Sequence, residues 1–253
     1  MNGAIEVTGL RYRYHDGTEA LRGVSFTIAP GECVGLLGPN GSGKSTLLLH
    51  LNGILPEKLS GKPSEDGAVR IAGQAITTAN LESVRRQVGL LFQDPDDQLF
   101  CPTVEEDVAF GPQQLGLVGK ELAARVERSL GLAGLSGYGH RATHHLSHGE
   151  KRRVCLAGVL ACEPTVLVLD EPTSDLDPRG RREFKTLLQG IPATKLIATH
   201  DLEWVVELCS RVIVLDGGAI VADGPTMEIL NDEVLMLAHG LERPHVLRHH
   251  HPH

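Results

Sequence analysis

Two kinds of apolar pattern along the chain predict strands. Short segments near the N-terminus alternate apolar and polar residues, as strands with one buried face do; they lie at 5–8, 11–14 and 24–28, with a turn signal at Asp16-Gly17. Unbroken apolar runs, typical of central parallel strands, follow at 33–37, 165–169, 195–199 and 211–215. Helical segments at about 179–189 and 201–209 separate the later runs. The pattern predicts an α/β protein with a mostly parallel sheet and an N-terminal antiparallel β layer.

Much of the segment between the apolar runs at 33–37 and 165–169 is helical in pattern. Thr103 and Glu106 have the spacing of a capping box, and Leu122, Val126 and Leu130 recur on one helical face. Glycines between 131 and 139 break the pattern before a second helix at about 149–161. We therefore predict a core at 1–93 and 164–225, an inserted helical subdomain at 94–163, and C-terminal helices with a histidine-rich tail at 226–253.

Shorter elements are predicted between the phosphate-binding region described below and this insert. A loop at 61–67 precedes a hairpin strand at 68–74, and a helix at 81–87 leads into a strand at 88–92. Near the other end of the chain, 226–240 has the pattern of one or two short helices, and we expect the residues from Glu242 onward to be ordered only in part.

Composition limits the possible classes of protein. The 253 residues are 41% hydrophobic, which is enough for a sizeable core. The formal charge of −8 argues against a broad nucleic-acid surface. Five scattered cysteines without a C-x-x-C pair are expected to be reduced thiols in a cytosolic protein. The N-terminus has no signal-peptide pattern, and the longest apolar stretch, at 154–162, is too short to span a bilayer.

A glycine-rich loop carries the most specific chemical signal. Residues 38–45 read G-P-N-G-S-G-K-S, a complete G-x-x-x-x-G-K-[ST] motif between a strand and a helix. Glycines let backbone N–H groups turn toward phosphate oxygens, and the following helix points its positive end at the same place. Lys44 is expected to reach the β- and γ-phosphates and Ser45 to bind Mg²⁺. The predicted nucleotide-binding set here is Gly38, Pro39, Asn40, Gly41, Ser42, Gly43, Lys44, Ser45 and Thr46.

Polar residues after other strands are the candidate catalytic groups. Asp170 ends a buried strand and is expected to hold Mg²⁺, and Glu171 follows as a candidate base for an attacking water. The alternative is a carboxylate pair that caps the turn at Pro172. His200 follows another strand and could contact the γ-phosphate, whereas a lone histidine there is usually structural. The ring of Tyr14 could stack on a purine base or be a half-buried strand tyrosine.

These motifs together resemble the nucleotide-binding subunit of an ABC transporter, over essentially the whole chain. The segment Leu146-Ser147-His148-Gly149-Glu150 resembles the ABC signature Leu-Ser-Gly-Gly-Gln, and 174–177 corresponds to the D-loop. Further correspondences are Gln93 with the Q-loop, 166–171 with the Walker B strand and catalytic glutamate, His200 with the switch histidine and Tyr14 with the base-stacking aromatic residue. The resemblance implies an α/β P-loop NTPase core with an N-terminal antiparallel β layer and an inserted helical subdomain.

Two residues of the signature depart from the family pattern. His148 stands where the family has its first glycine, and Glu150 stands where it has glutamine, while Ser147 and Gly149 are kept. An imidazole and an added carboxylate near a triphosphate could slow closure of the site or make it pH-sensitive. Neutral variation is the alternative, and the sequence favours it.

A narrower resemblance involves the segments 92–100 and 103–112. They are similar to the ATPases of energy-coupling-factor importers, most of all to the branch that imports cobalt or nickel. In that family a transmembrane partner docks arginine-bearing coupling helices beside the Q-loop, and the acids of these segments would suit it; they are Asp94, Asp96, Asp97, Glu105, Glu106 and Asp107. An acidic surface without a partner is the alternative.

The resemblance also implies a mechanism and partners. Two ATPase subunits, identical or paralogous, sandwich two ATP molecules head to tail, and Ser147 and Gly149 of one subunit meet the phosphate loop of the other. Lys44, Glu171 and His200 are the implied catalytic residues, and Ser45, Gln93 and Asp170 the implied Mg²⁺ ligands. The membrane partners are a transmembrane coupling subunit and a substrate-binding subunit, so we expect a peripheral location on the cytoplasmic face of the cell membrane and no nucleic-acid partner.

Other functions can be compared with this one. ABC ATPases of DNA repair carry a long coiled-coil insert, whereas the insert here has about 70 residues with glycine breaks. Translation-type ABC proteins carry two cassettes in one chain. A soluble kinase would leave the signature helix without a purpose. The nearest alternative is an ABC importer or exporter for another substrate, such as a vitamin, because substrate choice resides in the membrane subunits.

Histidines form two groups that could bind a metal. Six of the thirteen lie in the last residues, and another group lies in a loop before the signature. The first group is His239, His245, His249, His250, His251 and His253, and the second is His140, His144, His145 and His148. A flexible tail offers no preformed site, so we expect neither group to be a specific metal site.

Overall fold

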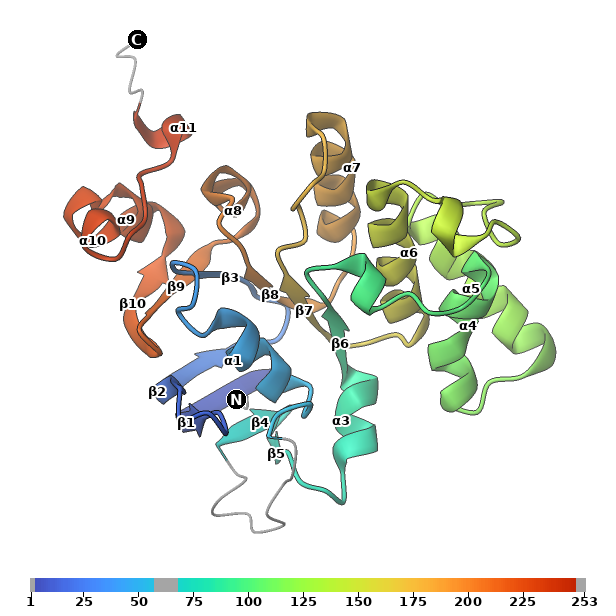
Figure 1. The fold of residues 1–253 in the computed structure, drawn as a ribbon, viewed down its shortest axis with the longest axis horizontal. Coiled ribbons are helices and arrows are strands. Elements are labelled where there is room, and N and C mark those ends of the chain that lie inside the picture. Colours follow the sequence, from blue (N-terminus) through green and yellow to red (C-terminus); the bar gives the residue numbers. More distant parts are fainter. Residues whose placement is uncertain (1–2, 57–67, 249–253) are drawn as a thin grey trace. The chain divides into compact units, whose positions relative to one another are not determined.

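The computed structural model describes residues 3–56 and 68–248. Its chain divides into two compact units, Met1–Arg85 with Ala193–His253 (unit 1) and Arg86–Pro192 (unit 2). Figure 1 shows the elements of both. The predicted loop at 61–67 and the tail histidines from His249 onward lie outside the described residues.

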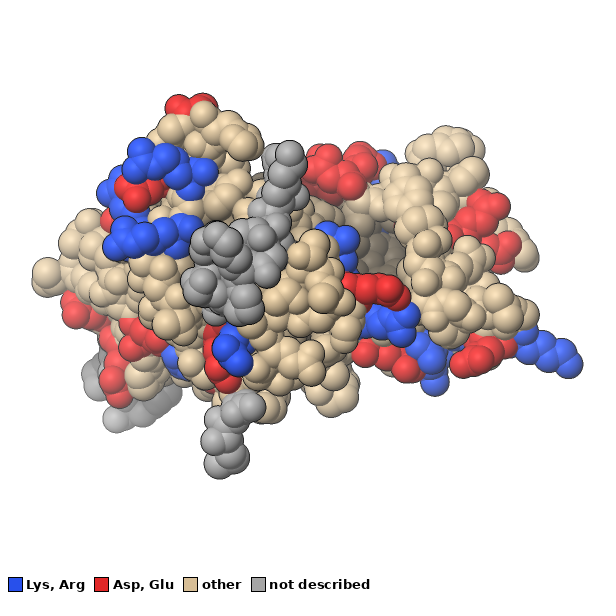
Figure 2. Space-filling view, turned by 90° about the horizontal axis from the view of Figure 1, so that it is seen from below, with Lys and Arg blue, Asp and Glu red and all other residues tan. Residues whose placement is uncertain are grey.

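Charged side chains of both signs are interspersed on the surface. On the face in Figure 2, lysine and arginine form small groups next to aspartate and glutamate, separated by uncharged atoms. That face has no continuous basic stripe of the kind that a nucleic-acid surface needs.

Unit 1 begins with the predicted antiparallel layer. Its sheet has the order β2 (Glu19–Ile28), β1 (Ile5–Arg13), β4 (Val69–Ile71), β5 (Gln74–Ala75). In the pairing of β1 with β2, Val7 lies opposite Phe26, and both side chains are buried. The intervening Glu6 and Thr27 are more exposed, because alternate residues of a strand point to opposite faces. The predicted alternation is confirmed.

The second set of strands in unit 1 forms a mostly parallel sheet. Its order is β10 (Ala219–Pro225), β9 (Arg211–Asp216), β3 (Cys33–Leu37), β8 (Thr194–Ala198). Strand β3 is parallel to both β8 and β9, and β10 returns antiparallel to β9. The interiors of β3 and β8 are buried, as their unbroken apolar runs predict.

The remaining helices of unit 1 connect or follow these strands. They are α1 (Lys44–Leu51), α8 (Leu202–Leu208), α9 (Thr226–Asn231), α10 (Glu233–Ala238) and α11 (His245–Arg248), while α3 (Leu81–Gln87) crosses the boundary between the units. The prediction of one or two short helices within 226–240 is confirmed, since α9 and α10 lie there.

Unit 2 combines a parallel pair of strands with four helices. The strands are β6 (Val88–Leu91) and β7 (Val166–Asp170). The helices are α4 (Val104–Gln114), α5 (Gly119–Leu132), α6 (His148–Ala161) and α7 (Pro178–Gln189), with short 3-10 turns η1 (Pro95–Asp97) and η2 (Thr143–His145). The unit is wider than the helical subdomain predicted at 94–163, because it also contains β6, β7 and α7.

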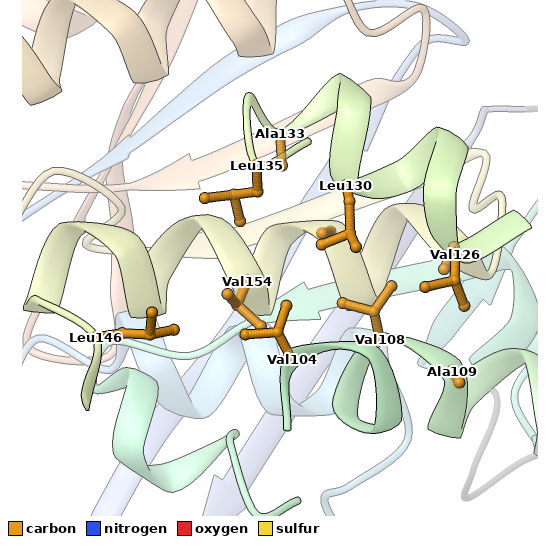
Figure 3. Close-up of a cluster of buried hydrophobic side chains, with 11 residues drawn as sticks. Val104, Val108, Ala109, Val126, Leu130, Ala133, Leu135, Leu146 and Val154 are labelled. Atoms are coloured by element: carbon orange, nitrogen blue, oxygen red, sulfur yellow. The ribbon is translucent and has the colours of Figure 1, made fainter. Parts of the chain in front are cut away.

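A buried apolar cluster joins α4, α5 and α6 (Figure 3). Val126 and Leu130 of α5 point toward α6 and α4, and Val104 and Val108 of α4 meet them. Leu122 packs at the edge of the cluster, so the face predicted from the spacing of residues 122, 126 and 130 is confirmed. Helix α4 begins with the predicted capping box, in which Thr103 and Glu106 bond each other's backbone N–H groups.

None of the helices within 3–56 and 68–248 is long and apolar enough to cross a membrane.

The cluster of Figure 3 predicts a large difference between two leucines of α5. Leu130 is 1% exposed, whereas Leu132, two residues later, is 57% exposed. We expect Leu130→Ala to lower the free energy of unfolding by about 2–5 kcal/mol, through lost apolar burial and the cavity left behind. Leu132→Ala is the matched control, with a change within about 0.5 kcal/mol. Urea denaturation followed by circular dichroism measures both, and similar losses in the two variants would contradict the packing.

Candidate functional site

The glycine-rich loop lies in unit 1 between β3 and α1, as predicted. Gly38, Gly41 and Gly43 have backbone φ values of 150°, 77° and 105°, which L-residues with a side chain rarely adopt. At Gly38 a Cβ would collide with the carbonyl oxygen of Leu215, and at Gly43 it would lie 2.6 Å from that of Ala20. Glycine is therefore required at both positions for the loop to approach the neighbouring backbone.

The polar groups of the loop are arranged for an anion. Lys44 Nζ donates to the carbonyl oxygens of Gly38 and Pro39, at 2.8 and 3.1 Å, so the ammonium group lies within the loop. Helix α1 has no side-chain cap, which leaves the N–H groups of its first turn to bind a ligand. The buried Ser42 Oγ has no hydrogen-bond partner among the described residues. The Lys44 ammonium group, the uncapped N–H groups of α1 and the Ser42 hydroxyl together fit a phosphate group.

A neighbouring hairpin holds the loop in place. The backbone N–H of Gly218, between β9 and β10, donates to Ser42 O at 3.1 Å, and Arg22 N donates to Gly218 O at 2.7 Å. His239, after α10, bonds Asp216 at the end of β9, with 2.8 Å between Nδ1 and Oδ2. The loop is thus bonded to the turn that ends β9, which lies next to β3 in the sheet.

Tyr14 and Thr46, both predicted to contact nucleotide, lie together. Their hydroxyl oxygens are 2.9 Å apart, which ties the residue after β1 to the first turn of α1. The ring of Tyr14 meets Tyr12 edge to face, at 4.9 Å between centroids, and Tyr12 in turn meets the buried His50 of α1. Burial lowers the pKa of His50, so this aromatic group stays uncharged at neutral pH. Stacking of Tyr14 on a base remains a prediction.

His200 follows β8 at the same edge of the sheet as the loop. Leu36 of β3 lies opposite Ala198 of β8, and Thr199 N donates to Leu36 O at 3.2 Å. The exposed His200 comes next, and Asp201 then caps α8 by accepting from Trp204 N at 3.2 Å. Asp201 is thus the N-cap of α8, and a phosphate-facing role of His200 remains a prediction.

In unit 2, Asp170 and Glu171 end the buried strand β7. Both residues are more than nine-tenths buried. Glu171 has a φ of 44°, in the left-handed region that is sparsely populated by non-glycine residues and often marks functional sites. The carboxylate of Asp170, like the hydroxyl of Ser45 in unit 1, is an oxygen donor of the kind that Mg²⁺ prefers, and the role of each as a ligand remains a prediction.

Arg152 of α6 joins three predicted parts of the site and was not predicted from the sequence. The residue is 1% exposed. Its guanidinium donates to the carbonyl oxygens of Gln93, at 2.6 Å, and Glu171, at 3.1 Å. Nη2 also lies 3.4 Å from Nε2 of His148, which can accept when the imidazole is neutral. One buried side chain thus connects the signature helix with the Q-loop residue and the candidate base.

Burial and nearby charges act in opposite directions on the protonation of Arg152. Burial lowers the pKa of Arg152, and nearby acids including Asp175 and Asp94 act in the opposite direction. The usual pKa of arginine lies so high that the side chain remains charged. A signal for this role existed in the sequence: Arg152 lies three residues before Cys155 and seven before Val159, on the buried face of α6.

The signature forms the start of α6 and is held by a second capping box. Ser147 Oγ and Ser147 N donate to Glu150 Oε2 at 2.9 and 2.8 Å. Tyr138 donates its hydroxyl to Glu150 Oε1 at 2.9 Å, and Arg141 lies 3.6 Å from the same oxygen and 3.7 Å above the Tyr138 ring. The exposed Ser147 is therefore fixed by Glu150.

Glu150 has mostly donors around it, and this explains its departure from the family glutamine. Ser147, Tyr138 and Arg141 all offer hydrogens, and a carboxylate can accept on both oxygens, whereas an amide accepts on its single oxygen and presents an NH₂ donor group in place of the other. The bonds from Ser147 hold the pKa of Glu150 below its ordinary value. These surroundings suit a carboxylate, and neutral variation with respect to activity stays a prediction.

The second glycine of the signature has a packing role. A Cβ on Gly149 would lie 3.3 Å from Cδ2 of Leu176, closer than side chains usually pack. Leu176 belongs to the segment 174–177 that resembles the D-loop. Gly149 thus lets this segment approach the start of α6. His148 lies beside the same segment, with 3.8 Å between Nε2 and Asp175 Oδ2.

The acids near Gln93 are only partly available to a partner. Asp107 is buried and accepts from the backbone N–H groups of Phe100 and Cys101, at 3.0 and 2.9 Å, so its role is internal and its inclusion in an acidic docking surface is wrong. Asp96 bonds Lys151 at 2.6 Å, and Glu106 is used in the cap of α4. Three acids of the set remain. Asp94 accepts a bond from the backbone N–H of Asp96, and Glu105 bonds the side chain of His140. Asp97 is exposed.

The described part of the chain contains no group of three or more histidine, cysteine, aspartate or glutamate side chains that could hold a metal ion. His239 and His140 instead pair with Asp216 and Glu105.

Comparison with known proteins decides the family. The model of the ABC transporter family matches residues 21–174, more than half of the chain. The chain belongs to the ABC transporter family. It is an ABC-type ATPase that binds ATP and is coupled to transport, with the phosphate loop, Walker B strand and signature described above.

Relatives and solved structures support this membership. The ABC ATPase is 55% identical to a Gloeobacter violaceus protein named as an ABC transporter ATP-binding protein, over 95% of this chain and 96% of the other. It is 47% identical to the energy-coupling factor transporter ATP-binding protein EcfA of Methanothermobacter thermautotrophicus, over 95% of this chain and 76% of that protein. The structure of cbiO1 from Clostridium perfringens, part of the ABC transporter complex cbiONQ, superposes with a TM-score of 0.79 at 37% identity, over 94% of each chain.

Arg152 and its neighbour Arg153 allow a matched test. Arg152→Met keeps an apolar stem but removes the donors to Gln93 O and Glu171 O, so we expect the free energy of unfolding to fall by about 1–3 kcal/mol. Arg153 is half-buried and pairs with Glu183, and Arg153→Met should lower it by at most about 1 kcal/mol. Chemical denaturation compares the two, and equal losses would argue against the connection.

The two capping boxes of unit 2 allow another matched test. Glu150→Gln places a donor among donors and should lower the free energy of unfolding by about 1 kcal/mol at neutral pH. Glu106→Gln should lower it by only about a few tenths of a kcal/mol. Because the pKa of Glu150 is lowered by folding, its stabilisation is present above its ordinary pKa and is lost as the pH falls through the lowered one.

The difference between wild type and Glu150→Gln should therefore close on acidification. Denaturation curves at pH 7 and at a series of pH values below the ordinary pKa measure this. A difference that is constant with pH would show that the carboxylate charge is unimportant.

Proposed function

We propose that this ABC ATPase hydrolyses ATP in a head-to-tail dimer and thereby powers import of cobalt, with nickel as a second candidate, through membrane-embedded partner subunits. The observation that carries the proposal is the likeness to cbiO1, which extends over 94% of both chains at 37% identity. The similarity to EcfA and the importer-like segments at 92–100 and 103–112 support the same class. The alternative within that class is an importer of another substrate, such as a vitamin.

The nucleotide is assigned to the loop and its surroundings. The phosphates lie against the N–H groups of residues 38–46, with Lys44 beside the β- and γ-phosphates, and the base stacks on Tyr14. Ser45, Gln93 and Asp170 would hold Mg²⁺. The ion supplies positive charge that stabilises the transferring phosphoryl group.

Hydrolysis is assigned to three side chains of this chain. Glu171 orients and deprotonates the attacking water, and its backbone is held by Arg152 through the carbonyl bond. Lys44 and His200 stabilise charge on the γ-phosphate. Arg152 also holds the carbonyl of Gln93, so a movement of the signature helix is transmitted to both residues.

The dimer is supported by the exposure of Ser147. Its side chain lies at the surface of unit 2 at the start of α6, where a second subunit can bring its own ATP. The serine hydroxyl and the N–H groups at this helix end are suited to a γ-phosphate. The glutamate that holds the serine also leaves the first turn negatively charged, so we expect the phosphate to approach from the side away from Glu150.

The membrane partner is expected to dock near Gln93. Phe100 and Phe110 are 65% and 42% exposed and meet edge to face at 4.8 Å. Such an aromatic pair, together with the exposed acids Asp94 and Asp97 that precede Phe100 in the chain, suits an arginine-bearing helix of a transmembrane subunit. We expect the ATPase to be a peripheral subunit at the cytoplasmic face of the membrane. A nucleic-acid partner is disfavoured by the negative net charge.

The catalytic base can be tested by a neutral isostere. We expect Glu171→Gln to keep ATP binding and to reduce turnover on the order of 10²–10⁴-fold, because a general base is lost while the fold is kept. Glu127→Gln, a change of an exposed glutamate of α5, should leave turnover unaltered. Steady-state phosphate release and nucleotide binding measure these values, and wild-type turnover in Glu171→Gln would remove Glu171 from this role.

The shared site and the substrate need separate experiments. ATPase activity measured against protein concentration should rise more steeply than linearly for a homodimer, and Ser147→Arg should abolish it while ATP binding persists.

For the substrate, uptake of cobalt, nickel and vitamins is compared in cells that carry the wild type or Glu171→Gln. Cobalt uptake that depends on Glu171 supports the proposal, and dependence of vitamin uptake alone would overturn the metal assignment.

A further inference from the structure

Two cysteines that are distant in sequence meet in unit 1. Cys33 begins β3, and Cys209 is the residue after α8. Their sulfur atoms are 3.7 Å apart. The other three cysteines, Cys101, Cys155 and Cys162, belong to unit 2.

The two thiols differ in exposure and in charge environment. Cys33 is partly exposed, whereas Cys209 is buried. Lys195 lies opposite Cys33 in the pairing of β3 with β8. The bond from the Cys209 thiol and the Lys195 charge lower the pKa of Cys33, while donation to Cys33 and burial raise that of Cys209. Cys33 is thus the more exposed and the more acidic thiol of the pair, as an attacking cysteine beside a resolving cysteine is expected to be.

We propose that Cys33 and Cys209 form a reversible disulfide when the protein meets a peroxide. The Cys33 thiolate attacks one peroxide oxygen, the O–O bond breaks, and the departing hydroxide takes up a proton, which leaves a sulfenic acid on Cys33. The Cys209 sulfur then attacks the Cys33 sulfur and expels water. In sum, two thiols and one hydrogen peroxide give one disulfide and two waters. A dithiol reductant reverses the reaction by thiol–disulfide exchange.

The sulfur atoms are close enough for this bond to form. They must approach from 3.7 Å to about 2.05 Å, a distance that rotation of the two side chains can supply. The backbone of Cys209 is held by bonds from its N–H to Val205 O, at 2.8 Å, and from Thr226 Oγ1 to its carbonyl, at 2.6 Å, so the movement falls to the side chains. The phosphate loop follows the other end of β3, so the bond forms away from the nucleotide site.

The bond links segments far apart in the chain. Residues 33 and 209 enclose most of the protein, and closing so long a loop restricts the unfolded chain. The oxidised protein should therefore unfold at a higher temperature than the reduced protein. The assignment does not depend on the transported substrate or on the dimer.

Thiol counting in the purified full-length protein tests the proposal. Hydrogen peroxide is added, excess is removed, and thiols are titrated in denaturant. We expect the count to fall from five to three and to return to five with dithiothreitol. Peptide mapping of the wild type should find residues 33 and 209 joined with the loss of two hydrogen atoms.

Variants assign the two thiols. Cys33→Ser and Cys209→Ser should each prevent the loss of thiols in pairs, whereas Cys162→Ser, the matched control in unit 2, should still form the bond. A wild-type map in which Cys33 is oxidised to sulfinic acid without a partner, or in which the joined peptides contain other cysteines, would overturn the proposal. Because the wild-type map needs no variant, the outcome does not depend on how well the variants fold.

Discussion

The arrangement of unit 2 depends on the hydrogen bonds that the buried guanidinium of Arg152 donates. A charge removed from water must be met by hydrogen bonds, and here the acceptors are the carbonyl oxygens of Gln93 and Glu171. Both carbonyls belong to segments that follow strands, and the carbonyl of Glu171 also accepts from Ser174 N at 3.1 Å. The bonds join the signature helix to the Q-loop residue and to the candidate base. Such a connection makes the positions of the three segments depend on one another.

A second principle in this protein is the matching of donors and acceptors. At the phosphate loop the donors exceed the acceptors: α1 lacks a side-chain cap, and Ser42 Oγ is buried without a partner among the described residues. At the signature, donors from Ser147, Tyr138 and Arg141 surround the carboxylate of Glu150. The first imbalance suits an anion from outside the chain. The second is satisfied within the chain, and it shows why the residue that departs from the family pattern is a carboxylate.

Much of the fold could be predicted from the sequence, because local patterns report local burial. The alternation in β1 and β2, the unbroken runs of β3 and β8, and the capping box of α4 were all visible and are all present. The phosphate loop was visible for a similar reason, since glycines with positive φ are needed within one short segment. Asp107 was misjudged, because its sequence neighbours are acidic and exposed, while its carboxylate is turned inward to two backbone N–H groups.

The sequence by itself determined the family, the order of the motifs and the residue types of the site, because each motif is a short segment whose chemistry is contained in its own residues. Tertiary structure alone decided which segments share a side chain. Arg152 reaches carbonyls 59 and 19 positions away, and Cys33 meets Cys209 across 176 positions. Contacts at such separations depend on how strands and helices pack, and hydrophobic periodicity carries no information about which distant polar atoms that packing brings together.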